Sequence, residues 1–278
     1  MMRYYAYHSA APFPKRVFIM QFIDIHSHIL PYLDDGAFSS EDSLEMARIA
    51  DESGISVMIC TSHASSHCRY SAKDLTVTLE HVADRLKKNG CAVTLVPGQE
   101  ILIRDDADEI LGDLENERFL TLAGSRYVLI EFRPGERSSE IIRSAELFAH
   151  SRFVPVIAHP ERYAALAADP GLAGELHAAG ALLQVNKGSL SGYFGKDARD
   201  TVIRLLESRQ ADFLASDAHS PFGRTPDLAA AHEWVSENCS PDYADRLVFR
   251  NPAHVLNDEP IRPASAGEHH GHHSYHGF

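Results

Sequence analysis

The sequence lacks the features that mark several protein classes. Its four cysteines, at positions 60, 68, 91 and 239, form no C-x-x-C pair, so neither a disulfide framework nor a thiolate zinc site is expected. The longest apolar run near the N-terminus, residues 17–25, is interrupted by Gln21 and Asp24 and is far below the roughly 20 residues that span a bilayer. No small-residue cleavage site follows this run. We therefore expect no membrane insertion, no secretory signal and a cytoplasmic location.

Positive charge is also scarce. Lys and Arg total 26 against 39 Asp and Glu, which gives a formal net charge of −13. A surface of this sign repels a nucleic-acid backbone, so no nucleic-acid partner is expected. Bound divalent cations would reverse the sign of a site lined with carboxylates, so a phosphate-bearing substrate stays compatible with the composition.

The chain does have the alternating pattern of a parallel sheet wound with helices. Its 278 residues suffice for one α/β barrel. Strand-like runs rich in β-branched residues are at 17–25, 55–62, 92–98, 126–132, 153–159, 181–186 and 211–217. Segments with helical periodicity are at 40–53, 71–89, 105–117, 136–149, 171–179, 196–209 and 226–238. Seven such units predict a single (βα)7-type, distorted TIM-like barrel rather than an open sheet.

Composition suggests where this barrel domain begins and ends. Residues 1–16 show no periodicity, and we expect a flexible N-terminal extension there. Residues 17–257 would form the barrel. Residues 258–278 are rich in Pro, Gly and His, a composition that cannot build a core, so a disordered His-rich tail is expected. Within the barrel, Ser40 is the expected N-terminal cap of the first helix and Gly54 its C-terminal cap.

Polar side chains collect where the predicted strands end, which in barrels of this kind is the end that carries the active site. Because side chains alternate along an extended chain, the H-x-H at 26–28 places two imidazoles on one side, and the D-x-H at 217–219 does the same for a carboxylate and an imidazole. The strand-end residues that could bind metal are His26, His28, His63, Glu100, Glu131, His159, Asp217 and His219.

This set of ligands predicts a metal-dependent hydrolase. Imidazole and carboxylate groups without thiolate suit Mn, Fe, Zn or Mg. Eight ligands exceed the needs of one ion, so we expect two or three divalent ions that share bridging carboxylates. Such a cluster lowers the pKa of a bridging water and clamps the oxygens of the group under attack.

The motifs DIHSH, TSH, GQE, LIEF, HPER and SDAH, in this order, resemble the polymerase and histidinol phosphatase (PHP) superfamily. The longer stretches DIHSHILPYLDDGAFSSEDSLEMARIA, SRYVLIEF, VPVIAHPERY and DAHSPFGRTP are similar to its manganese-dependent bacterial protein-tyrosine phosphatases of the CpsB/CapC type. The resemblance runs from about residue 22 to about residue 256. It implies the PHP form of the barrel, with the metals at the C-terminal ends of the strands.

The resemblance also implies roles for individual residues. Three metal positions are expected, with manganese first and iron, zinc or magnesium as alternatives. Arg162 and Arg224 fall where the family places phosphate-binding arginines, and their planar guanidinium groups suit phosphoryl oxygens. Asp35 falls where the family places an acid or a ligand of the third ion. The implied sets are His26, His28, Glu100 and Asp217 for one ion, Glu100, Glu131 and His159 for a second, and His63 and His219 for the third.

The activity implied is that of a phosphoric monoester hydrolase acting on phosphotyrosine in proteins, through a metal-activated hydroxide that attacks phosphorus in line. The implied partner is an autophosphorylated bacterial tyrosine kinase, and the implied process is control of capsule or exopolysaccharide synthesis. A thiol-based phosphatase is excluded, because no cysteine is followed by Arg six positions later.

Three other functions remain open at this point. One is a PHP phosphoesterase that takes a small substrate similar to histidinol phosphate. A second is a PHP exonuclease acting on DNA ends, which the acidic composition disfavours. The third is a metal-bound scaffold that binds a phosphorylated partner without turnover.

Several nearby residues have more than one interpretation. We expect Asp24 to orient an imidazole rather than to bind metal. Glu161 should point away from the metal site and be structural. Arg133 could bind phosphate or a surface carboxylate, and Asn186 could support a ligand or simply form hydrogen bonds at the end of its strand. The histidines of the tail could chelate metal without any catalytic role.

Overall fold

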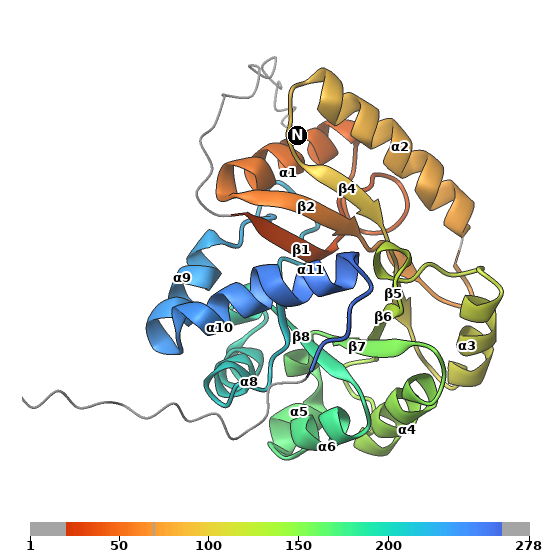
Figure 1. Cartoon of the computed structure of the whole chain (residues 1–278), viewed down its shortest axis with the longest axis vertical. Helices are drawn as coiled ribbons and strands as arrows, with labels where there is room; N and C mark the ends of the chain where they lie inside the picture. Colours follow the sequence, from red (N-terminus) through yellow and green to blue (C-terminus); the bar gives the residue numbers. More distant parts are fainter. Residues whose placement is uncertain (1–20, 69, 263–278) are drawn as a thin grey trace, which may run out of the picture.

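The computed structural model describes residues 21–68 and 70–262 (Figure 1). Each of the seven predicted runs contains a strand, and two very short strands, β3 and β5, were not predicted. The strands are β1 (Phe22–Ser27), β2 (Ile55–Cys60), β3 (His63–Ala64), β4 (Thr94–Pro97), β5 (Glu100–Leu102), β6 (Tyr127–Glu131), β7 (Val154–Ala158), β8 (Leu182–Asn186) and β9 (Phe213–Ala215). The expected N-terminal extension, residues 1–16, lies outside the described residues.

All of the strand pairs are parallel, and they form two sheets rather than one continuous ladder. One sheet has the order β1-β2-β4 and the other the order β3-β5-β6-β7-β8-β9. β3 follows β2 after a short break, and β5 follows β4 in the same way. At both breaks the chain passes from the first sheet into the second. Between the end of β1 and the residues after β9, two backbone hydrogen bonds join the two sheets: Asp217 N to His26 O at 2.9 Å and His28 N to Ala218 O at 2.8 Å. The expected barrel is therefore present, but it is distorted and its ladder is interrupted.

Helices cover the outside of these strands, as Figure 1 shows. The predicted helices correspond to α1 (Ser40–Ser53), α2 (Ala72–Lys88), α3 (Ala107–Glu115), α4 (Ser138–Ala149), α6 (Leu172–Ala178), α8 (Lys196–Glu207) and α9 (Ala229–Asn238). Short elements that were not predicted are α5 (Ala164–Ala168), α7 (Lys187–Leu190), α10 (Pro241–Asp245), α11 (Asn251–Leu256), the 3-10 turns η1 (Leu122–Gly124) and η2 (Pro160–Arg162), and the π-helical turn η3 (Arg246–Arg250). Among the described helices, none has both the length and the apolar character needed to cross a membrane.

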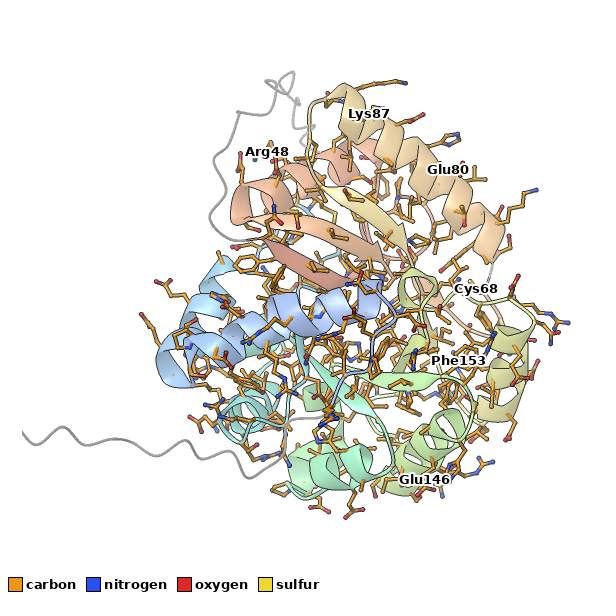
Figure 2. All side chains as sticks on the ribbon, in the orientation of Figure 1. Arg48, Cys68, Glu80, Lys87, Glu146 and Phe153 are labelled. Atoms are coloured by element: carbon orange, nitrogen blue, oxygen red, sulfur yellow. The ribbon has the colours of Figure 1, made fainter. Side chains whose placement is uncertain are left out.

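The first helix begins at Ser40, the residue expected to cap it, so its N-terminal cap lies one residue earlier than predicted. The side chain of Ser39, not Ser40, accepts a hydrogen bond from Asp42 N at 3.1 Å. Gly54 ends the helix as expected, with φ of 94°, a left-handed conformation that costs a glycine little. Figure 2 shows charged side chains such as Arg48 on α1, and Glu80 and Lys87 on α2, projecting from the outer faces of these helices.

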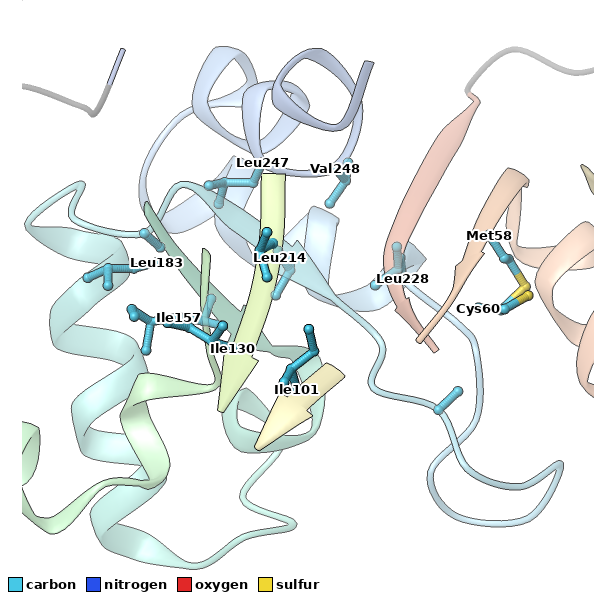
Figure 3. Close-up of a cluster of buried hydrophobic side chains, with 14 of the residues drawn as sticks. Met58, Cys60, Ile101, Ile130, Ile157, Leu183, Leu214, Leu228, Leu247 and Val248 are labelled. Atoms are coloured by element: carbon cyan, nitrogen blue, oxygen red, sulfur yellow. The ribbon is translucent and has the colours of Figure 1, made fainter. Parts of the chain in front are cut away.

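Two apolar clusters fill the molecule, one on each face of the strands. Ile101, Ile130, Ile157 and Leu183, from β5 to β8, belong to the larger cluster, which packs against the helices (Figure 3). The alternate positions of the same strands fill the barrel interior, as period-two alternation requires. That inner cluster includes Ile23, Ile25, Ile59, Leu122, Tyr127, Leu129, Val156, Ala158, Leu182, Phe213, Ala215 and Val255.

Residues 251–262, here called the C-terminal plug, close the end of the barrel where the strands begin. Val255 packs in the inner cluster, and Ile261 lies against it. The hydroxyl of Tyr127 donates to Glu259 O at 2.6 Å and accepts from Ile261 N at 3.0 Å. Residues 259 and 261, which were expected to belong to the tail, therefore contact the barrel. The rest of the expected tail, residues 263–278, lies outside the described residues.

Candidate metal centre

The structure brings all of the predicted metal ligands, together with Asp35, to one place at the C-terminal ends of the strands. We call these nine residues the ligand cluster. Their ligand atoms fall into four overlapping groups, each within 4.8 Å. The groups are His26, His28 and Asp217; His26, Glu100 and His159; His63, Glu100 and Glu131; and His28, Asp35, His63 and His219.

The strands deliver these side chains because their inward-facing positions change from apolar to polar near the C-terminal end. On β6, Leu129 lies in the inner apolar cluster and Glu131, two residues on, belongs to the ligand cluster. On β9, Ala215 lies in the inner cluster and is followed two residues later by Asp217. The same period-two spacing therefore builds the barrel interior and aims the ligands.

Two positions depart from that spacing. A register shift in the pairing of β1 with β2, between Asp24 and Ser27, lets the consecutive residues Ile25 and His26 both face inward. His159, directly after the inward-facing Ala158, has a φ of 34°. Asp217 has a φ of 49°. Left-handed backbone in residues other than glycine costs of order 1–3 kcal/mol and is concentrated at functional sites.

Two imidazole nitrogens and a carboxylate oxygen lie at the spacing that a single ion requires. His26 Nε2 is 3.1 Å from His28 Nε2 and 3.4 Å from Asp217 Oδ1, and His28 Nε2 is 3.5 Å from Asp217 Oδ1. Ligands about 2.0–2.2 Å from an ion in tetrahedral geometry lie about 3.3–3.6 Å apart, so these three atoms fit one first-row divalent cation. Glu100 Oε2 is 3.2 Å from Nε2 of both histidines.

The hydrogen bonds of the two imidazoles support the same fit. His26 Nδ1 is 2.7 Å from Gln184 Oε1, and His28 Nδ1 is 2.7 Å from Asp34 Oδ2. Both partners are acceptors, so each Nδ1 carries the proton and each Nε2 points its lone pair into the cluster. Two such lone pairs facing each other at 3.1 Å repel unless a positive charge lies between them. A metal-binding histidine whose other nitrogen is held by an acceptor has this arrangement.

The remaining ligands are arranged differently from the implied sets. His63 Nδ1 lies 3.0 Å from both Glu100 Oε2 and Glu131 Oε1, so His63 is grouped with the two glutamates as well as with His219. His159 Nε2 is 2.7 Å from Glu100 Oε1 but 3.7 Å from Glu131 Oε2. Glu100 is central, because its two oxygens contact four histidines.

Buried atoms without hydrogen bonds point to the same chemistry. Glu100 Oε2, His63 Nδ1 and His219 Nε2 are buried and have no hydrogen-bond partner. An unsatisfied buried polar atom costs about 1–3 kcal/mol. A bound cation would satisfy all three, and Glu100 Oε2 and His63 Nδ1 already lie 3.0 Å apart.

The carboxylates determine the charge of the cluster. Burial opposes protonation of His28, but the charge and hydrogen bond of Asp34 outweigh it and raise the pKa of His28 to about 9. Burial likewise opposes protonation of His63, and Glu100 and Glu131 overcome it and raise the pKa of His63 to about 12. The pKa of Glu100 is well below its ordinary value because nearby histidines outweigh its burial. Without metal the cluster therefore holds protons on imidazoles, which a cation must displace.

Both predicted phosphate-binding arginines reach the edge of the cluster. Arg224 Nη2 is 2.6 Å from Asp217 Oδ2, and Arg162 Nη1 is 3.5 Å from the same oxygen. The ring of Phe194 lies beneath both guanidinium groups, at 4.6 Å from Arg162 Cζ and 5.4 Å from Arg224 Cζ. Phe194 is a functional candidate that no pattern in the sequence singled out.

The DDG turn contains a second residue that was missed. Asp34, rather than the selected Asp35, orients His28 and also accepts hydrogen bonds from His63 N at 2.8 Å and Gly36 N at 2.9 Å. A Cβ on Gly36 would lie 2.2 Å from His28 O, so this close approach requires glycine. Asp35 lies 3.4 Å from Nε2 of both His63 and His219. The sequence shows that Asp34 and Asp35 are adjacent, but it does not show that their side chains contact the imidazoles of different histidines.

The residues left open by the sequence can now be placed. Asp24 was expected to orient an imidazole, and that expectation was wrong: it accepts from the backbone of His26 at 3.3 Å and Ser216 at 3.1 Å, and from the Ser216 hydroxyl. Asn186 donates to Asp217 Oδ2 at 2.5 Å and accepts from Gln184 at 2.8 Å, so it supports a ligand.

Two further residues lie outside the cluster. Glu161 is buried and binds Asn186 N at 2.9 Å and Ser189 Oγ at 2.6 Å, in agreement with a structural role. Arg133 is exposed on the loop after β6.

Comparison with known proteins gives consistent matches over most of the chain. The model of the family described as "Capsular polysaccharide synthesis, CpsB/CapC" matches residues 22–257. The tyrosine-protein phosphatase YwqE of Bacillus subtilis (strain 168) is 39% identical over 206 residues, which cover 71% of this chain and 77% of that protein. The putative tyrosine-protein phosphatase CapC of Staphylococcus aureus is 32% identical over 203 residues, with the same two coverages.

Solved structures agree with the sequence matches. A structure from work on YwqE of Bacillus subtilis and CpsB of Streptococcus pneumoniae, titled as unique metal-dependent tyrosine phosphatases, superposes with a TM-score of 0.80 at 33% identity. That superposition covers 86% of this chain and 96% of the other. An organophosphorus hydrolase of Deinococcus radiodurans superposes with a TM-score of 0.53 at 14% identity, over 85% of this chain and 92% of that one, a likeness of fold alone.

Proposed function

The chain belongs to the CpsB/CapC family of capsular polysaccharide synthesis proteins, and we propose that it is a metal-dependent protein-tyrosine phosphatase. The relatives named as tyrosine-protein phosphatases support the substrate class. One observation from this chain carries the proposal: Nε2 of His26 and Nε2 of His28 lie 3.1 Å apart, each lies 3.2–3.5 Å from an oxygen of Glu100 and of Asp217, and both Nδ1 atoms already have hydrogen-bond acceptors. Such an arrangement has no purpose in a barrel that binds no cation.

The ligand cluster would hold two or three divalent ions, with manganese as the first candidate. Four overlapping groups that share His26, His28, His63 and Glu100 support more than one ion, because a single ion takes four to six ligands. Bound there, divalent ions would supply an activated water near neutral pH and neutralise charge on phosphoryl oxygens.

The two arginines would bind the phosphoryl group of the substrate. Both guanidinium groups face Asp217 Oδ2 from the open side of the cluster, and they are 30% and 20% exposed for Arg162 and Arg224 respectively. Phosphoryl oxygens accept hydrogen bonds from a guanidinium group in the same way as the carboxylate oxygens of Asp217 do. Both arginines can therefore bind the substrate after a small change in side-chain position. Their charge would stabilise the oxygens as negative charge builds up in the transition state.

Asp35 would act as a ligand at the opening of the cluster. Its carboxylate lies between His63 and His219, and the nearby His219 outweighs partial burial and lowers the pKa of Asp35. An ionised carboxylate in this position suits coordination better than proton donation to a leaving group. The side chain is 69% exposed, so it can move when substrate enters.

The substrate would be phosphotyrosine in a protein, and an autophosphorylated bacterial tyrosine kinase of a capsule or exopolysaccharide system is the partner we propose. The family description supports the process. The barrel domain would include the C-terminal plug and end after residue 262.

The decisive experiment compares the full chain with a chain that ends at Arg262, so that the tail histidines cannot bind metal adventitiously. Both proteins are stripped of metal and assayed with Mn, Mg, Zn and Fe on a phosphotyrosine peptide, a phosphoserine peptide, histidinol phosphate and single-stranded DNA. We expect metal-restored hydrolysis that is strongest on phosphotyrosine. His150→Ala, which changes an exposed histidine directly after α4 and outside the cluster, is the matched control for His26→Ala. Hydrolysis without metal, or a preference for DNA, contradicts the proposal.

A further inference from the structure

Exposed aromatic side chains gather around the opening of the ligand cluster. Of the six large apolar side chains that are exposed among the described residues, four lie on loops that follow β1, β8 and β9. Single exposed aromatics are ordinary, but several together at one end of a barrel mark a contact surface. These four, here called the aromatic rim, are Tyr32 (73% exposed), Phe38 (87%), Tyr193 (59%) and Phe222 (71%).

The loop that carries Phe222 is short and held by its own backbone. His219 N and Ser220 N donate to Arg224 O at 2.9 and 3.2 Å, which closes the loop on itself. Ser220 Oγ accepts from Phe222 N at 2.9 Å and donates to Phe222 O at 3.1 Å. Phe222 is thus fixed at the tip, three residues from a ligand-cluster histidine and two from a proposed phosphate-binding arginine.

Tyr32 and Phe38 lie on the loop after β1 that also carries Asp35. They come three residues before and three residues after Asp35, and Asp35 Oδ1 is 3.4 Å from His219 Nε2, so the two loops meet there. Tyr32 has a φ of 68°. Left-handed backbone is unfavourable for an aromatic residue, and with the side chain 73% exposed, burial within the chain does not offset that cost.

The depth of the cluster restricts which substrates can reach it. The side chains of His26, His28 and Glu100 are fully buried, whereas His63 is 37% and Asp35 69% exposed. A phosphoryl group must therefore enter past Asp35 and His63. The side chain that carries it has to extend from the surface, between the two aromatic loops, to the buried ligands, and an aryl side chain reaches further than a serine does.

From these observations we infer that Phe222, with Tyr32 and Phe38 across the opening, contacts the aromatic ring of the phosphotyrosine and so selects aryl over alkyl phosphates. The inference rests on the proposed phosphatase function and adds the residues that would provide its specificity. Aromatic pairs have favourable stacked and edge-to-face geometries that an alkyl chain cannot provide. These contacts are separate from those of the arginines, which bind only the phosphoryl group.

The test measures kcat and KM for a phosphotyrosine peptide, and the inhibition constant of inorganic phosphate, in the metal-loaded full-length protein. For Phe222→Ala we expect KM to rise about 3- to 10-fold while kcat changes less than about twofold. The inhibition constant of phosphate, which has no ring, should stay within about twofold. Phe222→Tyr should restore KM. Phe249→Ala removes an equally apolar exposed ring on η3, outside the rim, and should leave both constants unchanged.

Two results overturn the inference. One is a KM for Phe222→Ala equal to that of the unchanged protein. The other is an equal rise in KM and in the inhibition constant of phosphate, because the loop would then act on the arginines rather than on the ring. If the unchanged protein hydrolyses no phosphotyrosine peptide while hydrolysing another phosphate ester, the proposed function itself fails, and this outcome is distinct from the other two.

Discussion

The two ends of the barrel differ in the side chains that they bury: one end buries apolar groups and the other buries ionisable groups. Where the strands begin, the C-terminal plug covers the inner apolar cluster, and its contacts are apolar packing around Val255 and Ile261 with hydrogen bonds to Tyr127. Where the strands end, nine ionisable side chains meet, several of them fully buried. The first end gains stability from burial, whereas the second holds charges and left-handed residues that are unfavourable without a cation.

This difference teaches that stability and function occupy separate parts of the same strands. β6 illustrates it, because Tyr127 begins the strand in the plug contacts, Leu129 fills the interior and Glu131 ends it in the ligand cluster. Substitutions at one end should therefore change stability with little effect on turnover, and substitutions at the other end should do the reverse. Four predictions test this separation.

The largest expected effect is on turnover at the ligand-cluster end. Asp217→Asn keeps the size of the side chain but removes a charge that a cation requires, so kcat on a phosphotyrosine peptide should fall by several orders of magnitude. Divalent metal at a hundredfold excess over its dissociation constant should stabilise the unchanged protein by about 2.7 kcal/mol, and the variant should lose most of this gain. Steady-state kinetics and thermal unfolding with and without metal measure the two effects. Normal turnover in Asp217→Asn would contradict the assignment of catalysis to the ligand-cluster end of the barrel.

The next effect is the pH dependence of metal binding. In the metal-free protein the pKa of His28 is about 9, so between pH 7 and 9 a cation must displace its proton, and metal affinity should rise up to about tenfold per pH unit. The stability of the metal-free protein should depend on pH in the opposite direction. Folding raises the pKa of His28 above its unfolded value of about 6.5, so the contribution of protonated His28 to the free energy of unfolding is complete below pH 6.5 and is lost as pH rises through 9. Titration calorimetry with Mn at several pH values checks the affinity. An affinity that does not change with pH contradicts the protonation of the cluster.

A smaller effect is expected at Phe194, which supports both arginines. Phe194→Leu removes the ring face beneath the two guanidinium groups but keeps an apolar side chain, so KM for a phosphotyrosine peptide should rise about 3- to 10-fold. The inhibition constant of inorganic phosphate should rise by a similar factor, in contrast to Phe222→Ala. Phe194→Trp should restore both values. If neither constant changes in Phe194→Leu, the ring does not position the arginines.

The smallest effect on activity is expected at the plug. Tyr127→Phe removes the hydrogen bonds to Glu259 and Ile261 and should lower the free energy of unfolding by about 1–3 kcal/mol, with kcat unchanged. A chain ending at residue 257 should be less stable than one ending at Arg262, because it also loses the ion pair of Arg126 with Asp258 at 2.9 Å. Chemical denaturation gives both values. A loss of turnover in Tyr127→Phe measured well below its unfolding temperature would show that the two ends are coupled.

Much of this architecture could be predicted from the sequence because it depends on local periodicity. Seven of the strands and seven of the helices follow alternation and helical spacing, which are properties of consecutive residues. β3 and β5 could not be predicted, since each follows another strand after a short break and has too few residues for a periodic signal of its own. The position of the plug was also missed, because the contacts of Ile261 are with residues far away in the sequence.

The sequence by itself determined the candidate residues: the imidazoles and carboxylates at the strand ends were selected from residue type and strand position, and the two arginines from the family resemblance. Only the tertiary structure decided how they are used. It gave Asp34 the role of orienting His28 and placed Phe194 beneath two arginines, while Asp24 turned out to bind backbone rather than an imidazole. The physical reason is that the period of a strand fixes which side of the chain a residue faces. Which partner it meets there depends on register shifts, left-handed residues and contacts between distant loops, and no local pattern records these.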